Sequence, residues 1–159
     1  MTATAYDRAV AMLAARSYGT SELRRQLLLK GCAASEVADA IARLAAAGYL
    51  DDAAYAKLVV RSKLLNGGMS PRRLRAELHR RGVDPDTAER AIRDVVQDES
   101  IDLAAVLDQL ARRKARTLAG HDDMTRRRRL YAFLARRGYD RDDILRVLEG
   151  ALVHGRAAR

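Results

Sequence analysis

Apolar residues recur along the whole chain with the spacing of amphipathic helices, and no stretch alternates apolar and polar residues as a strand does. The clearest pattern is a pair of leucines four residues apart, followed four residues later by a glycine. It occurs three times, at Leu23, Leu27 and Gly31; at Leu74, Leu78 and Gly82; and at Leu130, Leu134 and Gly138. Because these glycines are 51 and 56 residues apart, the pattern predicts a repeat of roughly fifty residues.

Each leucine–glycine pattern is flanked by two further apolar stripes with helical spacing. The stripes after the glycines are Val37, Ala40, Ile41 and Leu44; Ala88, Ala91, Ile92 and Val95; and Ile144, Val147, Leu148 and Ala151. The stripes before them are Tyr6, Ala9, Val10 and Leu13; Tyr55, Leu58, Val59 and Ser62; and Leu103, Val106, Leu107 and Leu110. The sequence therefore predicts an all-α fold of about nine helices in three tandem three-helix repeats, over residues 1–50, 51–99 and 100–159. Such repeats seldom bury their apolar faces alone, so we expect them to stack into an elongated, curved array.

The predicted helix ends carry residues that suit them. Pro71 and Pro85 each follow a capping residue, Ser70 or Asp84, and this places each proline at the first helical position. The three repeat glycines stand where a helix ends in a left-handed residue.

The residues that carry catalysis or bind metals do not cluster in this sequence. The single cysteine, Cys32, excludes an internal disulfide, and the three histidines are 42 and 33 residues apart, so neither a metal site nor a cofactor is expected. Three pairs of adjacent carboxylates stand at predicted helix starts, where capping is a better interpretation than acid–base catalysis: Asp51-Asp52, Asp122-Asp123 and Asp142-Asp143. We therefore expect a protein that is not an enzyme.

The charge of the chain narrows the class of partner. The net charge is +9 with a pI near 10.3, and residues 100–159 alone carry +6, which favours nucleic acid, a nucleoprotein or an anionic membrane surface. The longest run without a charged residue is eight residues, far below the ~20 of a membrane span. The N-terminus also lacks the basic and apolar regions of a signal peptide, so a cytoplasmic location is expected.

Arginines occupy matching positions in the second and third repeats. On the middle helix of each repeat they lie opposite the leucine pair, at ten, nine and two residues before the glycine: Arg72, Arg73 and Arg80, then Arg128, Arg129 and Arg136. Arg75 flanks the first set. A solvated helix face normally mixes charges of both signs, whereas these triplets contain no acid, so we interpret them as an anion-facing surface. Without interleaved aromatic residues, contacts to a phosphate backbone fit better than base stacking.

The first repeat departs from this pattern, with Ser21, Glu22 and Leu29 at the three matching positions. Leu28 and Leu29 broaden the apolar face of the helix beyond its leucine pair. We expect this extra width to pack against the second repeat, with docking of another protein as the alternative.

Three segments of the chain resemble the RecX family of bacterial regulatory proteins: Ser21–Gly31 (SELRRQLLLKG), Gly48–Ala56 (GYLDDAAYA) and Gly67–Leu78 (GGMSPRRLRAEL), the last leading to Gly82 and Val83. The resemblance covers residues 5–95 most closely and extends into the last third through the repeat. It implies structural roles for Tyr49, Leu50, Tyr55, Leu74, Leu78 and Gly82, and a helix cap at Asp51-Asp52. The contact candidates are Arg72, Arg73, Arg75 and Arg80, followed by Arg128, Arg129 and Arg136.

The family resemblance also implies a function. RecX proteins are small helical proteins without a cofactor that bind the RecA recombinase, chiefly as its filament on DNA, and suppress its ATPase and strand exchange. On this basis we expect a monomeric, non-enzymatic regulator of RecA. The alternative is a sequence-nonspecific protein that binds single- or double-stranded DNA and merely competes with RecA for it.

Overall fold

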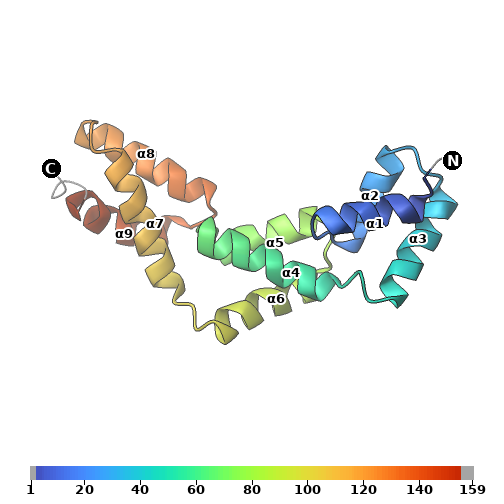
Figure 1. Cartoon of the computed structure of the whole chain (residues 1–159). Coiled ribbons are helices and arrows are strands. Elements are labelled where there is room, and N and C mark those ends of the chain that lie inside the picture. Colours follow the sequence, from blue (N-terminus) through green and yellow to red (C-terminus); the bar gives the residue numbers. More distant parts are fainter. Residues whose placement is uncertain (1–2, 155–159) are drawn as a thin grey trace. The chain divides into compact units, whose positions relative to one another are not determined.

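The computed structural model describes residues 3–154, and these residues form only helices, turns and loops (Figure 1). The nine α-helices of this range are α1 Ala5–Ala15, α2 Thr20–Leu29, α3 Ala34–Ala46, α4 Asp52–Arg61, α5 Pro71–Arg80, α6 Pro85–Asp98, α7 Leu103–Thr117, α8 Asp123–Arg136 and α9 Arg141–His154. A π-helical turn, Ser62–Asn66, extends α4. The all-α prediction and the expected number of helices are confirmed for the described range.

The two prolines begin helices as the sequence predicts. Ser70 Oγ accepts a hydrogen bond from the Arg73 N–H at 3.2 Å at the start of α5, and Asp84 Oδ1 accepts one from the Thr87 N–H at 3.0 Å at the start of α6. Both caps satisfy an N–H group that has no partner within its own helix, so the sharp starts of α5 and α6 follow from local sequence.

Only two of the three pairs of adjacent carboxylates contain the residue that caps the following helix. Asp51 and Asp122 cap the helices that follow them, accepting from Ala54 N–H at 2.9 Å and Thr125 N–H at 3.0 Å. The cap of α9, however, is Asp140, which accepts from the Asp143 N–H at 2.8 Å. The third pair, Asp142-Asp143, therefore lies inside the first turn, and its assignment as a cap is wrong.

The chain divides into two compact units whose boundaries fall inside helices. One unit contains the chain up to Val59 together with Arg75–Ala91, and the other contains Val60–Leu74 and the chain from Ile92 onward. The division passes through α4, α5 and α6, so the middle three helices contribute to both units.

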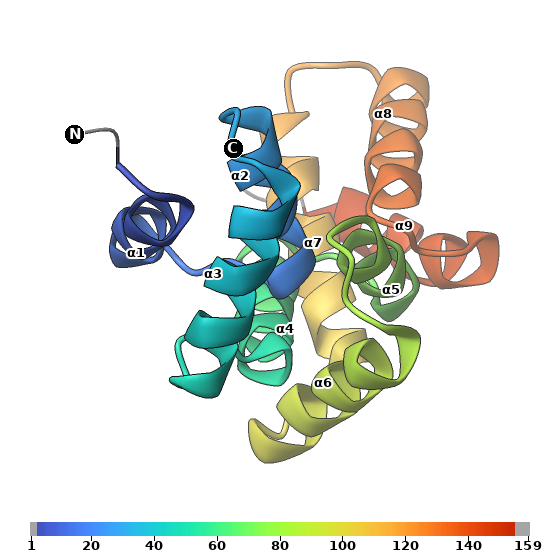
Figure 2. The ribbon, with the colours of Figure 1, turned by 90° about the vertical axis from the view of Figure 1, so that its right-hand side faces the viewer.

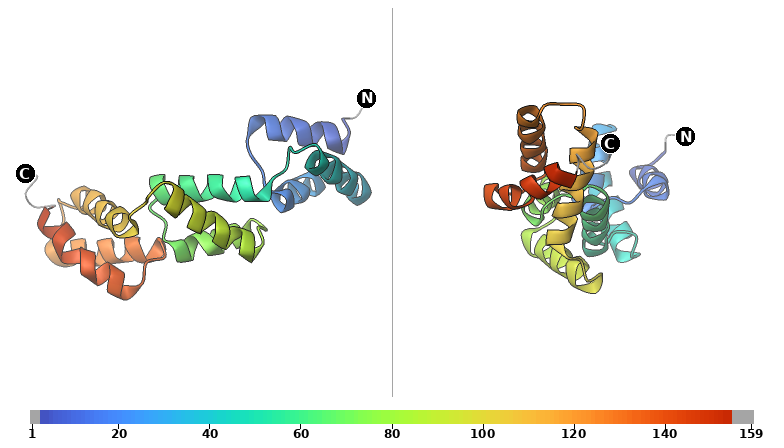
Figure 3. Two further views of the ribbon diagram at one scale, coloured as in Figure 1. Left: turned by 90° about the horizontal axis from the view of Figure 1, so that it is seen from below. Right: turned by 90° about the vertical axis from the view of Figure 1, so that its left-hand side faces the viewer.

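Each unit is built around a packed group of three helices. In the first, α1, α2 and α3 pack together around a core that includes Leu23, Leu27 and Leu44 (Figure 2). In the second, α7, α8 and α9 do the same around Leu130 and Leu134 (Figure 3). The leucine pairs and the stripes that follow the glycines are buried in all three repeats, as predicted.

The predicted stripes of the first helices are partly wrong. Val10 and Leu58 are exposed, while Ala5 and Ala56, which lie outside the predicted stripes, are buried. A count of apolar spacings does not distinguish these two faces of a helix.

Candidate anion-binding surface

The four candidate arginines of α5 fall into two pairs with different surroundings. Arg72 and Arg73, in the first turn, are exposed, and their guanidinium groups make no hydrogen bond or ion pair with any described residue. Arg75 instead forms a two-point contact with Glu89, at 2.6 and 3.0 Å, which raises the pKa of its guanidinium. Arg80 is held by Glu77 at 2.9 Å. Only Arg72 and Arg73 are therefore available without first breaking an ion pair.

The candidate arginines of α8 are similarly divided. Arg128 and Arg136 are exposed and have no partner among the described residues. A nitrogen of Arg129 lies 2.9 Å from Nε2 of His121, so this side chain is already engaged. Two of the three candidate arginines on α8 are thus without a partner among the described residues.

The arginine run in α8 also contains a residue whose role the sequence did not indicate. Arg126 is only 3% exposed; it donates to the Leu152 carbonyl at 3.1 Å and to Asp123 Oδ1 at 3.3 Å. Arg127, next to it, pairs with Glu149. Arg126 therefore ties α8 to α9, and helical position relative to Leu130 was the only available signal for its burial.

The end of α8 adjoins the start of α5, where Arg72 and Arg73 lie. The Ser70 N–H donates to the Arg137 carbonyl at 3.0 Å, which joins the end of α8 to the start of α5. Gly138 has a φ of +90°, and a Cβ at this position would lie 2.5 Å from the Cβ of Arg73. This close approach needs a glycine. It also places the turn that follows Arg136 against Arg73, so the end of α8 adjoins the first turn of α5.

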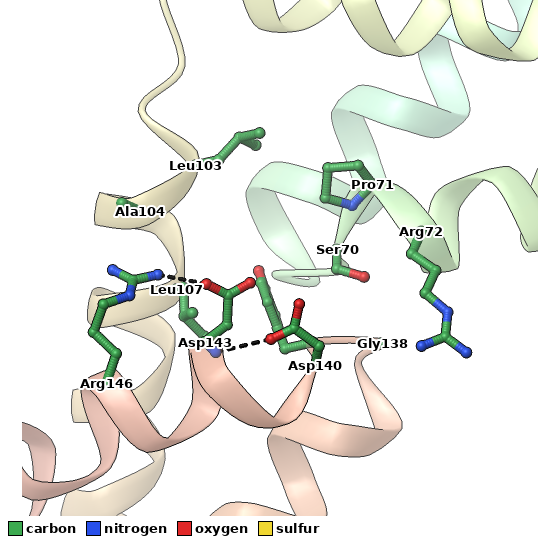
Figure 4. A pocket seen from close by; sticks show the side chains of 11 residues that line it. Ser70, Pro71, Arg72, Leu103, Ala104, Leu107, Gly138, Asp140, Asp143 and Arg146 are labelled. Atoms are coloured by element: carbon green, nitrogen blue, oxygen red, sulfur yellow. Dashed lines mark hydrogen bonds and ion pairs between the residues drawn. The ribbon is translucent and has the colours of Figure 1, made fainter.

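A pocket of about 320 Å³ borders this junction (Figure 4). Arg72 stands at one edge, and Asp140 and Asp143 lie across the pocket from it. Both carboxylates are engaged, since Asp140 caps α9 and Asp143 pairs with Arg146 at 2.7 Å. Burial, together with the negative charge of Asp143, raises the pKa of the lining Tyr139 to about 12, so this phenol is neutral at physiological pH.

A second helix junction, in the first unit, uses an ion network instead of free arginines. Gly82 has a φ of +79°, and a Cβ there would lie 2.4 Å from the Cβ of Ser21 at the start of α2. Beside it, Arg81 donates to the Tyr55 hydroxyl at 2.8 Å, and that hydroxyl donates to Glu22 Oε2 at 2.6 Å. Glu22 also receives a hydrogen bond from Arg16 at 3.0 Å. These contacts join the first two repeats through polar groups, of which Glu22 and Tyr55 are buried.

Glu22 is charged although it is 8% exposed. Burial alone would raise the pKa of its carboxyl, but hydrogen bonds from Tyr55 and Arg16 and the charge of Arg81 hold that pKa below its usual value. In the repeat pattern, Glu22 occupies the position that Arg73 and Arg129 occupy in the second and third repeats, nine residues before the glycine. The structure shows that it faces a neighbouring repeat, not a partner molecule.

The residues singled out by the family motif lie in three environments. Leu74, Leu78, Tyr55 and Leu50 are buried, whereas Tyr49 is 67% exposed and does not belong to the core. Asp52 has a role that the motif did not suggest: its Oδ1 accepts a hydrogen bond from the Thr20 N–H at 2.7 Å and so caps α2 from the start of α4.

Sequence models of one family match all three repeats. The models described as the first, second and third three-helix domains of RecX match residues 5–44, 51–92 and 101–148. The chain belongs to the RecX family. Regulatory protein RecX of Trichlorobacter lovleyi is 37% identical over 150 residues, covering 90% of this chain and 92% of the relative. The protein of the same name from Mycobacterium avium is 37% identical over 150 residues, covering 93% and 84%.

Solved RecX structures share the fold. RecX from Lactobacillus salivarius matches with a TM-score of 0.69 and 18% identity over 94% of this chain and 95% of its own. A further crystal structure of regulatory protein RecX matches with a TM-score of 0.71 and 19% identity over 91% and 70%.

Two other kinds of site are absent from the described part of the chain. Between residues 3 and 154 there is no helix with the length and apolar character of a membrane span. The same part of the chain brings together no group of three histidine, cysteine or acidic side chains suited to holding a metal ion.

Proposed function

We propose that this chain is a non-enzymatic regulator that binds the RecA recombinase as a filament on DNA and inhibits its ATPase and strand-exchange activity. Membership of a family whose relatives are named regulatory proteins supports a regulatory role. The observation that carries the proposed contact is a set of four exposed arginines without intramolecular partners on two adjoining helices: Arg72 and Arg73 on α5, and Arg128 and Arg136 on α8.

These four arginines suit a partner with closely spaced anionic groups. A guanidinium forms two parallel hydrogen bonds with a carboxylate or a phosphate, and an arginine without an ion pair loses no existing contact on binding. Arg128 and Arg136 are eight residues apart on one helix, a rise of about 12 Å. A filament of protein on DNA offers both kinds of anion, acidic side chains of RecA and DNA phosphates, along a surface of that scale.

A second function remains in competition: a basic protein that binds single- or double-stranded DNA without sequence preference and displaces RecA from it. The net charge of +9 favours this alternative. Under either function we propose a cytoplasmic location, where RecA and its DNA substrates are found. We also propose a monomer that acts without a cofactor.

The deciding experiment is RecA-catalysed, single-strand-dependent ATP hydrolysis, with this protein titrated well below the concentrations of RecA and of DNA sites. Inhibition at substoichiometric amounts supports control of the filament, because too little protein is present to cover the DNA. Inhibition that appears only when the protein saturates the DNA supports competition instead.

The arginine surface is tested in the same assay with a matched pair of charge reversals. Arg72→Glu with Arg73→Glu should abolish inhibition without changing helical content, because both side chains are exposed and unpaired. Arg43→Glu with Arg90→Glu introduces the same charge on exposed helix faces elsewhere and should leave inhibition in place. Equal inhibition by both double variants would remove the α5 arginines from the mechanism.

A further inference from the structure

A groove of about 630 Å³ lies between α1 and α2 in the first unit. Met12 and the small side chains of α1 form one wall, Gln26 lies on the other, and Arg8 and Lys30 are its charged members. No acidic residue lines it. The Arg8 guanidinium is held in place by the Lys30 carbonyl, at 2.9 Å. The groove therefore combines an apolar wall with fixed positive charge.

An exposed leucine lies on α2 beside the groove, on the side of Gln26. Leu29 is 74% exposed and Leu28 is 45% exposed, so the packing expected for them from the sequence is wrong. Leu29 follows Gln26 by three residues and Arg25 by four, and these spacings place it on the helix surface between the groove and an exposed arginine. Arg25 has no ion pair with any described residue.

We infer that this groove, with its edge at Leu29, is a docking site for an acidic amphipathic segment of a partner protein. The inference rests on the proposed function and assigns the RecA filament a second, protein-directed contact. The charge of the groove complements that of an acidic segment, because the cations Arg8, Arg25 and Lys30 have no acidic residue beside them here. The one acidic residue of α2, Glu22, is buried and paired with Arg16.

The chemistry of the groove favours a protein partner over a nucleic acid. An exposed leucine gains free energy when apolar surface of a partner covers it, because water is then released. A phosphate backbone offers no such apolar surface. The aromatic ring in the groove, Tyr18, is already covered on one face by the Arg16 guanidinium, 3.6 Å from the ring centre. That face cannot stack on a base.

The repeat position of Leu29 is occupied by a different kind of residue in the second and third repeats. Two residues before the repeat glycine, the first repeat has Leu29, whereas the second and third have Arg80 and Arg136. The α5–α8 surface is therefore cationic without exposed leucines, and the groove is both cationic and apolar. We expect the two surfaces to recognise different parts of one assembly.

The test compares Leu29→Glu with Ala42→Glu, which adds the same charge at an exposed position on α3 outside the groove. Binding of the full chain is measured to RecA filaments on single-stranded DNA and, separately, to the same DNA without RecA. We expect Leu29→Glu to weaken filament binding about tenfold, as loss of an interface anchor does, and to leave binding to bare DNA within about twofold. Ala42→Glu should behave like the wild type.

A second variant separates the apolar contribution from the charge. Leu29→Ala removes the apolar side chain without adding a charge and should weaken filament binding by about threefold while the helical circular dichroism stays constant. Equal filament binding by Leu29→Glu and the wild type would refute the groove as a docking site without affecting the proposal for the arginines of α5 and α8. A parallel loss of binding to bare DNA would refute the inference that the groove binds a protein partner. A wild type that binds no filament would defeat the proposed function and this inference together.

Discussion

Replacement of Gly82 by alanine tests the close contact between the first two repeats, and Gly31 provides a matched control. The two glycines have nearly the same backbone, with φ of +79° and +81°. A Cβ at Gly31 meets nothing within 4 Å, whereas a Cβ at Gly82 would lie 2.4 Å from Ser21 Cβ. Both alanine variants therefore suffer the same left-handed strain, and Gly82→Ala alone suffers a clash.

The magnitudes follow from these two contributions. Left-handed strain costs about 1–2 kcal/mol, offset by about 0.4–1 kcal/mol because alanine restricts the unfolded chain, so Gly31→Ala should lower the free energy of unfolding by about 1 kcal/mol. Overpacking adds about 1–3 kcal/mol, so Gly82→Ala should lower it by about 2–4 kcal/mol. Urea denaturation followed by circular dichroism measures both.

A double-mutant cycle assigns the extra cost to its source. Ser21→Gly removes the Cβ that Gly82→Ala would meet, so the two substitutions together should be less destabilising than their sum by at least about 1 kcal/mol. Ser21→Gly combined with Gly31→Ala should be additive. If Gly31→Ala and Gly82→Ala cost the same, or if the first cycle shows no coupling, the close repeat junction is incorrect.

Three further predictions concern the buried polar groups. Asp52→Ala should lower the free energy of unfolding by about 1 kcal/mol in urea denaturation, because the Thr20 N–H loses its cap. Arg126→Ala should cost about 2–3 kcal/mol in the same assay, since it leaves the Leu152 carbonyl without its charged donor, whereas Arg128→Ala should stay within about 0.5 kcal/mol. Hydrogen bonds to Glu22 and Glu77 outweigh the effect of burial and hold the pKa of both carboxyls below the usual 4.5. The stabilisation from these groups is therefore present above pH 4.5 and is lost as the pH falls through the folded-state pKa. Tyr55→Phe removes one hydrogen bond to Glu22, so it should make this acid transition, followed by circular dichroism, shallower.

The sequence predicted those parts of the fold that depend on local signals. Pro71 after Ser70, and glycine after a leucine pair, act through the backbone of their own helix, so their pattern was sufficient. The reach of Asp52 to α2 and the burial of Arg126 depend on contacts between residues more than twenty positions apart. No periodicity in one sequence encodes such pairs.

The same limit applies to the candidate surface. Helical spacing placed the arginines correctly opposite the leucine pair, since Arg72, Arg73, Arg128 and Arg136 are all exposed. It could not show that Arg75 was paired with Glu89 on the next helix, because that contact joins two separate elements. Periodicity thus identified the face, and tertiary contacts selected which of its charges are free.

The two repeat junctions explain why the first repeat lacks the arginine surface of the second. The residue before each junction glycine is an arginine, and Arg81 pairs with Glu77 on its own helix at 2.8 Å, donates to the Tyr55 hydroxyl, and lies 3.9 Å from Glu22 across the junction. Arg137, the equivalent residue, instead donates to the Gly67 carbonyl and packs against the Phe133 ring at 5.1 Å. Because a backbone carbonyl satisfies Arg137, the position nine residues before the glycine in the second repeat need not be an acid. In the first repeat that position is Glu22, a buried counter-ion, and in the second it is free to carry Arg73 on the surface.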